Sequence, residues 1–216
     1  LRMPSQPQLK GISAAPGLAQ GAAFCVVESA IVHSADSLEP TIDLSGALAL
    51  ASSQLVELME HIAGEEAEIL EFQLAMLEDE ALSDPVRQAV AAGTTLIEAW
   101  QETLDEHVTD YEQSEDEYFQ ARASDLRDIR ERVLRILRGE TEDEIPEGAI
   151  LLATDLTPSC FLSLDWNKGG GVVLREGSPS SHVAMLARSR GVPMLVGIRD
   201  LPAGAFPDQT RLLLDA

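Results

Sequence analysis

The sequence predicts an α/β domain with an all-α helical bundle inserted into it, because its texture changes twice along the 216 residues. Residues 1 to about 40 are punctuated by Gly, Ala and Pro and hold one apolar run, Ala22–Val27, as in a loop followed by a strand. The stretch from about 44 to 138 is rich in Ala, Leu, Glu, Gln and Arg, which favour helices. From about 145 onward, short apolar runs bounded by turn residues return.

The central stretch divides into a series of expected helices. Leu70, Leu74 and Leu77 share one helical stripe, and Gly139 stands where the last helix should end. Pro85 is the one proline of this stretch. The expected helices cover about 44–63, 65–81, 84–92, 94–112 and 115–138.

The C-terminal stretch predicts strands around a short helix. The helical pattern is Ser181–Arg190, closed by Gly191 and Pro193, and strand, helix and strand within this length favour a compact α/β unit. The apolar runs are 149–153, 171–174, 194–196 and 211–214. We therefore predict a discontinuous α/β domain, 1–40 and 140–216, and a helical subdomain, 41–139.

The charge balance excludes some partners. Asp and Glu number 37 against 15 Lys and Arg, for a formal net charge of -22, which argues against nucleic acid and against an anionic membrane surface. A basic protein partner and a merely solvated acidic surface both stay open. The sequence has no apolar run long enough to span a membrane, no signal-peptide pattern and no cysteine spacing typical of zinc. We therefore expect a cytoplasmic protein without a metal in this chain.

His182 is the histidine whose neighbours suggest chemistry. It follows Ser180 and Ser181, either of which can cap a helix that His182 begins. A helix start offers N–H groups and a dipole that favour phosphate, so a histidine there can accept a phosphoryl group. Arg175 and Arg188 add positive charge nearby. A structural role in the first turn remains the alternative. The other histidines, His33, His61 and His107, have no such neighbours.

Two further segments could serve function or only structure. Asp155–Ser159 follows an apolar run, where polar groups often form sites in α/β sheets, although a simple turn with a capping Ser or Thr also explains it. The helix 64–80 has a wide apolar face, including Met76, between acidic ends. That face is either a broad core contact or an adaptable surface for a basic partner.

The segment 177–197 resembles the phosphohistidine signature of the phosphoenolpyruvate-utilising enzymes. That signature runs Gly-Gly-x-Thr-Ser-His, then a helix with Ala-Arg, then Pro-x-x-Val-Gly. Within this family, four further segments resemble Enzyme I of the sugar phosphotransferase system. Residues 10–17 resemble its opening strand and loop, and residues 72–79 resemble its helical hairpin. Residues 124–130 resemble its last bundle helix, and residues 155–159 resemble the turn before its site.

The resemblance implies a phosphoryl relay. It implies a swivelling α/β phosphohistidine domain whose His182 takes a phosphoryl group from phosphoenolpyruvate and passes it to an HPr-type carrier protein. A C-terminal barrel domain, absent from this chain, would bind phosphoenolpyruvate and Mg²⁺, so this chain alone should only exchange phosphoryl groups with the phosphorylated carrier. The implied phosphate-supporting residues are Ser180, Ser181, Thr157 and Arg188. The implied carrier-binding residues are Glu65, Glu66, Met76, Glu78, Asp79 and Arg127.

Departures from the family pattern suggest a paralogue. Ser178 and Pro179 replace the second Gly and the residue after it, which stiffens the loop and removes one N–H. Gln73 replaces an expected histidine, and Phe161 stands where a Thr is expected. A nitrogen-regulatory or dihydroxyacetone-linked carrier system would fit. The alternatives are a swivelling domain of a pyruvate phosphate dikinase or phosphoenolpyruvate synthase, and a non-catalytic helical interaction module.

Overall fold

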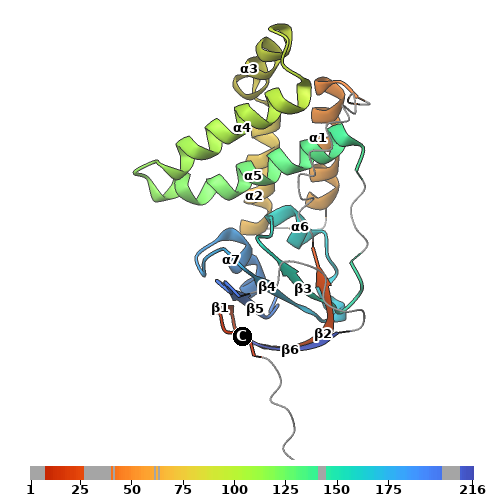
Figure 1. Cartoon of the computed structure of the whole chain (residues 1–216), viewed down its shortest axis with the longest axis vertical. Helices are drawn as coiled ribbons and strands as arrows, with labels where there is room; N and C mark the ends of the chain where they lie inside the picture. The colour runs from red at the N-terminus through yellow and green to blue at the C-terminus, as the bar shows by residue number, and fades with distance from the viewer. Residues whose placement is uncertain are drawn as a thin grey trace, which may run out of the picture. The chain divides into compact units, whose positions relative to one another are not determined.

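The chain folds into two compact units, one α/β and one helical. The computed structural model describes residues 8–26, 40, 42–60, 62, 64–140, 145–200 and 210–216. Within these, the α/β unit comprises 8–26, 145–156, 164–200 and 210–216, and the helical unit comprises 40–140 and 157–163. The predicted fold class, an α/β domain with a helical insertion, is confirmed (Figure 1). In the described ranges, no helix is long and apolar enough to cross a membrane.

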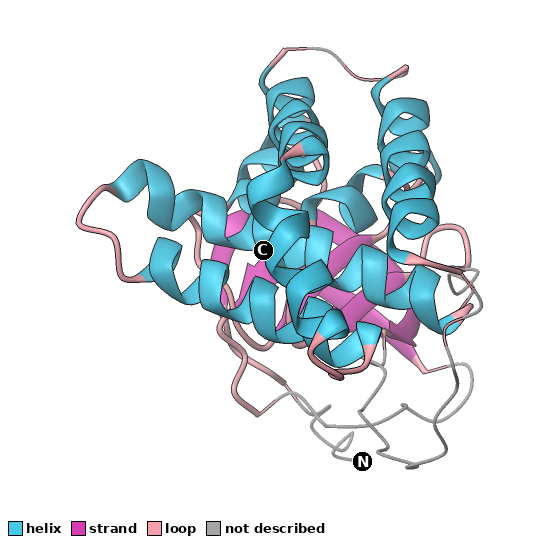
Figure 2. Cartoon of the chain, turned by 90° about the horizontal axis from the view of Figure 1, so that it is seen from above, coloured by secondary structure: helices cyan, strands magenta, loops and turns pink. Residues whose placement is uncertain are grey.

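The α/β unit is built on a mixed sheet, whose strands are magenta in Figure 2. Its strands are β1 (Ile12–Ala15), β2 (Leu18–Cys25), β3 (Ile150–Ala153), β4 (Gly171–Leu174), β5 (Met194–Val196) and β6 (Arg211–Asp215). They lie in the order β1-β5-β4-β3-β2-β6. The four inner strands run parallel, and β1 and β6 are antiparallel at the edges.

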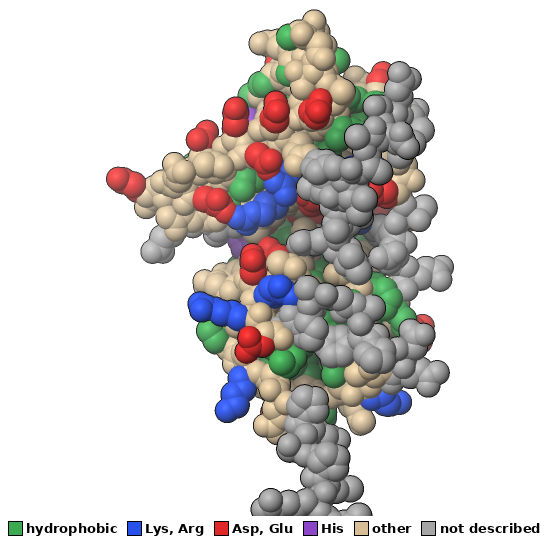
Figure 3. Space-filling model, in the orientation of Figure 1, with side chains coloured by type: hydrophobic (Ala, Val, Ile, Leu, Met, Phe, Trp, Pro, Cys, Tyr) green, Lys and Arg blue, Asp and Glu red, His purple; other side chains and the backbone are tan. Residues whose placement is uncertain are grey.

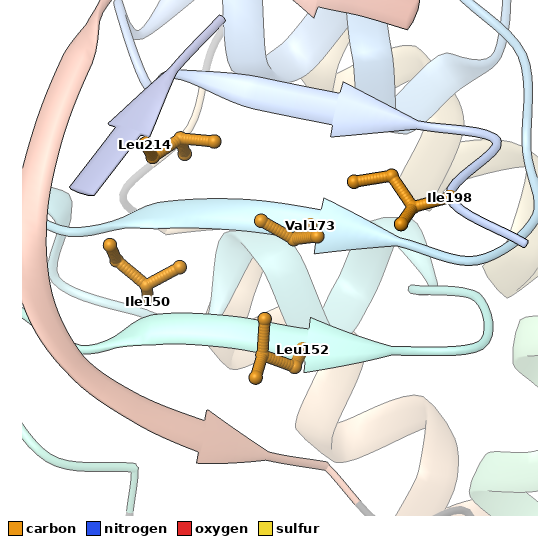
Figure 4. Close-up of a cluster of buried hydrophobic side chains, with 5 residues drawn as sticks. All are labelled: Ile150, Leu152, Val173, Ile198 and Leu214. Carbon is orange, nitrogen blue, oxygen red and sulfur yellow. The ribbon is translucent and has the colours of Figure 1, made fainter. Parts of the chain in front are cut away.

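Apolar side chains form the core of this unit. Every residue of β3 and β4 is buried, as expected for parallel strands at the centre of a sheet. Figure 4 shows one cluster, in which Ile150 and Leu152 of β3 meet Val173 of β4, together with Ile198 and Leu214. The four strands predicted in the C-terminal stretch are confirmed to within one residue.

The N-terminal strands differ in part from the prediction. The apolar run indicated one strand at Ala22–Val27, and the resemblance indicated an opening strand within 10–17. The chain forms β1 within 10–17 and then a long β2 that already begins at Leu18. The first half of β2 was missed because it alternates exposed and partly buried residues instead of forming an apolar run. A glycine is required within it, because a Cβ at Gly21 would lie 2.2 Å from the carbonyl oxygen of Gly148.

The helical unit contains the predicted helices with sharper ends. They are α1 (Leu44–Met59), α2 (Glu65–Glu78), α3 (Glu80–Ala91), α4 (Leu96–Glu112) and α5 (Glu117–Arg138), followed later in the chain by α6 (Pro158–Leu162). Thr95 and Glu98 form a capping box at the start of α4. Gly139 ends α5 in the left-handed conformation, with φ 67°, as predicted.

The predicted start of α3 was wrong. The sequence placed it at residue 84, beside Pro85, but α3 begins at Glu80 and Pro85 lies inside it. Asp79 is the actual cap, since its side chain accepts a hydrogen bond from the Ala81 N–H at 2.8 Å. Helix α3 therefore begins where the Asp79 carboxylate caps it, and Pro85 lies inside the helix.

A buried polar cluster joins three helices of the helical unit. Asp128 on α5 is 1% exposed and accepts a hydrogen bond at 3.0 Å from Nε2 of Gln73 on α2. It also accepts from the backbone N–H of Ser159 at 2.8 Å and from the Ser159 hydroxyl at 2.5 Å. These bonds fasten α6 to α5, which explains why 157–163 belong to the helical unit although both flanking segments belong to the α/β unit.

Candidate functional site

His182 is the first residue of α7 (His182–Ser189), which packs against β1 in the α/β unit. The chain reaches it from the carboxyl end of β4, which lies between β3 and β5. Backbone bonds from Arg175 to Ala153 and from Glu176 to Thr154 extend the β3–β4 ladder to the start of the loop. His182 therefore lies beyond the carboxyl ends of parallel strands, where sites in α/β sheets usually form.

The loop before His182 is held by its own serines. Gly177 opens it with φ 89°, a left-handed conformation that strains other residues. The Ser178 hydroxyl accepts from the Ser180 N–H at 3.2 Å and lies 2.9 Å from the Ser180 hydroxyl. Ser181 caps α7, because its Oγ accepts from the Ala184 N–H at 3.2 Å. The predicted capping is thereby assigned to Ser181, and Ser180 belongs to the loop.

Arg188 ties this loop to the sheet. Its Nη1 donates to the carbonyl oxygen of Pro179 and to the carbonyl oxygen of Ala14 in β1, both at 2.8 Å. The half-buried imidazole of His182 follows directly on a loop fixed from both sides. A histidine in the first turn of a helix can act as a nucleophile toward phosphorus, and the helix N-terminus favours the phosphoryl oxygens.

The remaining predicted phosphate-supporting residue lies in the other unit. Thr157 caps α6, its Oγ1 accepting from the Cys160 N–H at 3.4 Å, and thus belongs to the helical unit. Ser180, Ser181 and Arg188 lie in the same unit as His182, the two serines directly before it and Arg188 bonded to Pro179 of the same loop. Phe161 on α6 is fully buried and forms part of the core.

Two family profiles together match most of the chain. The profile described as "PEP-utilising enzyme, N-terminal" matches residues 10–122, which is more than half of the chain. The profile "PEP-utilising enzyme, mobile domain" matches residues 145–216, the segment that carries His182.

The chain belongs to the family of PEP-utilising enzymes.

Curated members of the PEP-utilising family share this sequence over most of its length. The phosphoenolpyruvate-protein phosphotransferase of Listeria monocytogenes is 33% identical over 208 residues, which cover 91% of this chain and 36% of that protein. The protein of the same name from Bacillus subtilis is 31% identical over 204 residues, 89% of this chain and 36% of that protein. This chain thus spans about a third of the length of these relatives.

Solved structures show the same fold. An Enzyme I protein studied by NMR in solution aligns over 96% of this chain and 89% of its own, with a TM-score of 0.67 and 25% identity. The "N-terminal domain of Enzyme 1 - Nitrogen" aligns over 96% of this chain and 90% of its own, with a TM-score of 0.63 and 25% identity. The predicted resemblance to the N-terminal domain of Enzyme I is confirmed.

In this PEP-utilising chain, four of the six predicted carrier-binding residues lie on α2, Asp79 follows as its C-cap, and Arg127 lies apart from them, on α5. Glu78 and Asp79 are exposed, and Glu66 and Met76 are half-buried. The structure describes only the backbone of Glu65, which is the first residue of α2. Asp79 also caps α3. Arg127 forms an ion pair with Glu112 of α4.

Sequence analysis missed an aromatic–arginine cluster, consisting of Phe72, Tyr111, Tyr118, Phe119 and Arg122. The Arg122 guanidinium lies 4.7 Å from the Phe72 ring centre and 5.2 Å from that of Tyr118. Tyr118 and Phe119 are 56% and 41% exposed. Adjacent aromatic residues at a helix start, after the Asp116 cap, were the available signal.

Two other places were considered for a ligand. In the described part of the chain, no three His, Cys, Asp or Glu side chains meet in a way that could hold a metal ion. A cavity of about 340 Å³ lies at the amino ends of β2, β4 and β5, lined by residues including Gly17, Trp166 and Pro193. Those ends are opposite to the edge from which the His182 loop departs, so the cavity is not part of this site. His107 is half-buried in α4, and His33 and His61 lie outside the described residues.

Proposed function

We propose that this chain carries a phosphoryl group on His182 and exchanges it with an HPr-type carrier protein. The observation that carries the proposal is the place of His182, at the first position of α7 after a loop held by Arg188 and Ser181. The curated relatives are named phosphoenolpyruvate-protein phosphotransferases, so phosphoenolpyruvate is the proposed original donor. We assign its binding, with Mg²⁺, to the part of the relatives' length that this chain does not cover.

The proposed step is an exchange between two imidazoles. A ring nitrogen of His182, Nε2 by resemblance to the family, forms a bond to phosphorus while the N–P bond of the carrier's phosphohistidine breaks. The electron pair of the broken bond returns to the carrier's imidazole, so no net proton is gained or lost. Because phosphoryl transfer depends mainly on positioning and charge stabilisation, the fixed loop and the start of α7 supply what the chemistry requires.

The carrier is proposed to dock on the helical unit. Glu66, Met76 and Glu78 on α2, with Asp79 at its C-cap, offer carboxylates and one adaptable apolar side chain. Acidic side chains also line the face of α4 that Figure 3 displays, which suits a basic partner. The aromatic–arginine cluster adds residue types that commonly dominate binding energy at interfaces.

The test is intact-mass analysis after this chain is mixed with a panel of phosphorylated HPr-type carriers. We expect a gain of one phosphoryl mass that is lost in acid and is absent from His182→Ala. The matched control is His107→Ala, which removes a half-buried histidine of α4 and should leave the gain unchanged. A phosphoryl group on another residue, or one stable in acid, would show that His182 is not the carrier.

A binding measurement on the same proteins tests the docking surface. Tyr118→Ala should weaken carrier binding by about tenfold or more, because truncation of an interface aromatic often costs over 1 kcal/mol. His182→Ala should bind normally. If His182→Ala also abolished binding while Tyr118→Ala had no effect, the carrier would dock on the α/β unit instead.

A further inference from the structure

The Arg188 side chain spans from one end of α7 to the loop at the other. Arg188 lies in the last turn of α7, six residues after His182. Side chains of a helix lean toward its N-terminus, so a long side chain at this position can reach the loop that precedes the helix. Its Nη1 meets the carbonyl oxygens of Pro179 and Ala14 at 2.8 Å each. The two N–H bonds of this nitrogen are therefore both committed to backbone.

The two carbonyl groups belong to segments far apart in sequence. Pro179 is three residues before His182, and Ala14 is a buried residue of β1, which hydrogen bonds to β5. The hydrogen bonds among Ser178, Ser180 and Ser181 close the loop on itself but do not attach it to the sheet. The Arg188 bonds make that attachment, because one guanidinium nitrogen holds the loop and an edge strand together.

The residue held by Arg188 is itself stiff. Proline has a fixed φ and no N–H, so Pro179 can be anchored only through its carbonyl oxygen. A loop with one restricted dihedral and one anchored carbonyl has little freedom left at the residue where it turns toward Ser181. That restriction lowers the reorganisation needed when His182 meets phosphorus, which is the general benefit of a preorganised site.

We propose that Arg188 is a positioning residue for phosphoryl transfer, acting through the carbonyl groups of Pro179 and Ala14 and not through contact with the phosphoryl group. This inference rests on the proposed function and deepens it, since sequence analysis assigned Arg188 to the phosphate itself. The assignment rests on Nη1, whose two N–H groups both donate to backbone oxygens in this unit. Contact of Nε or Nη2 with the phosphoryl group is the competing role that the experiments must separate.

The experiment compares Arg188→Met with the unaltered chain in exchange with a phosphorylated HPr-type carrier. Loss of the Arg188 hydrogen bonds to Pro179 and Ala14 should lower kcat by about ten- to a hundredfold, because a small misplacement of a reacting group lowers the rate by this order. KM should stay within about twofold, since the carrier is proposed to dock on the helical unit. Every molecule should still become phosphorylated, given time. Arg199→Met, which removes an exposed arginine of the same unit, should leave kcat unchanged.

A second measurement separates positioning from direct contact. The ³¹P NMR titration midpoint of phospho-His182 should be the same in Arg188→Met and in the unaltered chain, since an arginine that touched the phosphoryl group would favour its dianion. Arg188→Lys should recover part of kcat, because an ammonium can donate to at least one carbonyl oxygen. Arg188→Gln, which is uncharged, replaces the methionine variant if that variant does not fold.

The outcomes are distinct. An unchanged kcat in Arg188→Met, or a titration midpoint raised in that variant, would overturn the positioning role. A fall in the fraction of molecules that can be phosphorylated, at an unchanged rate for the rest, would overturn it in favour of a purely structural role. Absence of phosphorylation in the unaltered chain would instead overturn the proposed function.

Discussion

The two units of this chain differ in the kinds of side chain that they bury. Among the described residues, every buried polar or charged side chain belongs to the helical unit, and the buried side chains of the α/β unit are apolar. The seven are Gln73, Ser83, Thr103, Asp125, Asp128, Arg132 and Ser159. In a sheet, backbone hydrogen bonds between strands already fix which residues lie opposite one another. Helices satisfy their backbone internally, so side chains must set how they pack.

This difference indicates what holds each unit in a single packed arrangement. In the α/β unit, glycines allow close approaches and the apolar core can be filled by shape alone. In the helical unit, Asp128 selects one arrangement of α2, α5 and α6, because displaced helices would leave its hydrogen bonds unmade. Phosphoryl transfer is proposed for the α/β unit, whose buried side chains are apolar, on the His182 loop that follows β4 of its sheet.

The largest expected effect is the loss of the Asp128 cluster. Asp128→Ala should lower the free energy of unfolding of the helical unit by about 3 to 5 kcal/mol, because it leaves the Gln73 amide and both Ser159 donors buried without an acceptor. Trp100 is fully buried in the helical unit, so its fluorescence in a Trp166→Phe background reports this unit during urea unfolding.

The control for this change is Asp110→Ala, which removes an exposed carboxylate of α4 and should shift stability by less than about 0.5 kcal/mol. If both variants lost the same stability, the buried cluster would not set the packing of this unit. If amide exchange in β3 and β4 rose as much as in α5, the two units would unfold as one.

The fold class and the start of a helix at His182 could be predicted from sequence because their signals are local. Short apolar runs indicated the four C-terminal strands, and a serine before a helical pattern indicated the start of α7. The apolar-run pattern did not indicate the first strand, β1, because its half-exposed, four-residue sequence has no such run, whereas the resemblance of 10–17 to the opening strand of Enzyme I did indicate it. The start of α3 was misplaced by four residues because several Asp and Glu residues before residue 84 could equally have been the cap.

The buried polar cluster could not be predicted from local patterns. Gln73 and Asp128 are 55 residues apart, and Ser159 is 31 residues beyond Asp128. Gln73 was identified only as a departure from an expected histidine, and nothing in the helical pattern indicated that it is fully buried. Pairing of polar groups over such separations depends on tertiary packing, which periodicity does not report.

The domain boundaries stay a prediction, since residues 27–39 and 141–144 lie outside the described ranges.

A smaller effect is expected from a hydroxyl placed in the α/β core. Val173→Thr keeps the shape of the side chain, but its hydroxyl enters a cluster made of Ile150, Leu152, Ile198 and Leu214. An unpaired buried hydroxyl should cost about 1 to 3 kcal/mol, measured by amide exchange of β3 and β4. Val90→Thr on α3 is the control, because Val90 is 40% exposed and its hydroxyl would reach water. Equal costs at the two positions would mean that the α/β core accepts polar groups as the helical core does.

The smallest effect compares two helix caps, one in each unit. Thr95→Ala removes the capping box of α4, and Ser181→Ala removes the cap of α7. Each should lower the stability of its own unit by about 1 kcal/mol, which is the usual cost of losing such a cap. Only Ser181→Ala should also slow phosphoryl exchange, because it frees the first turn that carries His182. Stopped-flow exchange with a phosphorylated carrier, run beside urea unfolding, separates the two quantities. Equal slowing in both variants would mean that exchange follows stability and not the geometry of the His182 loop.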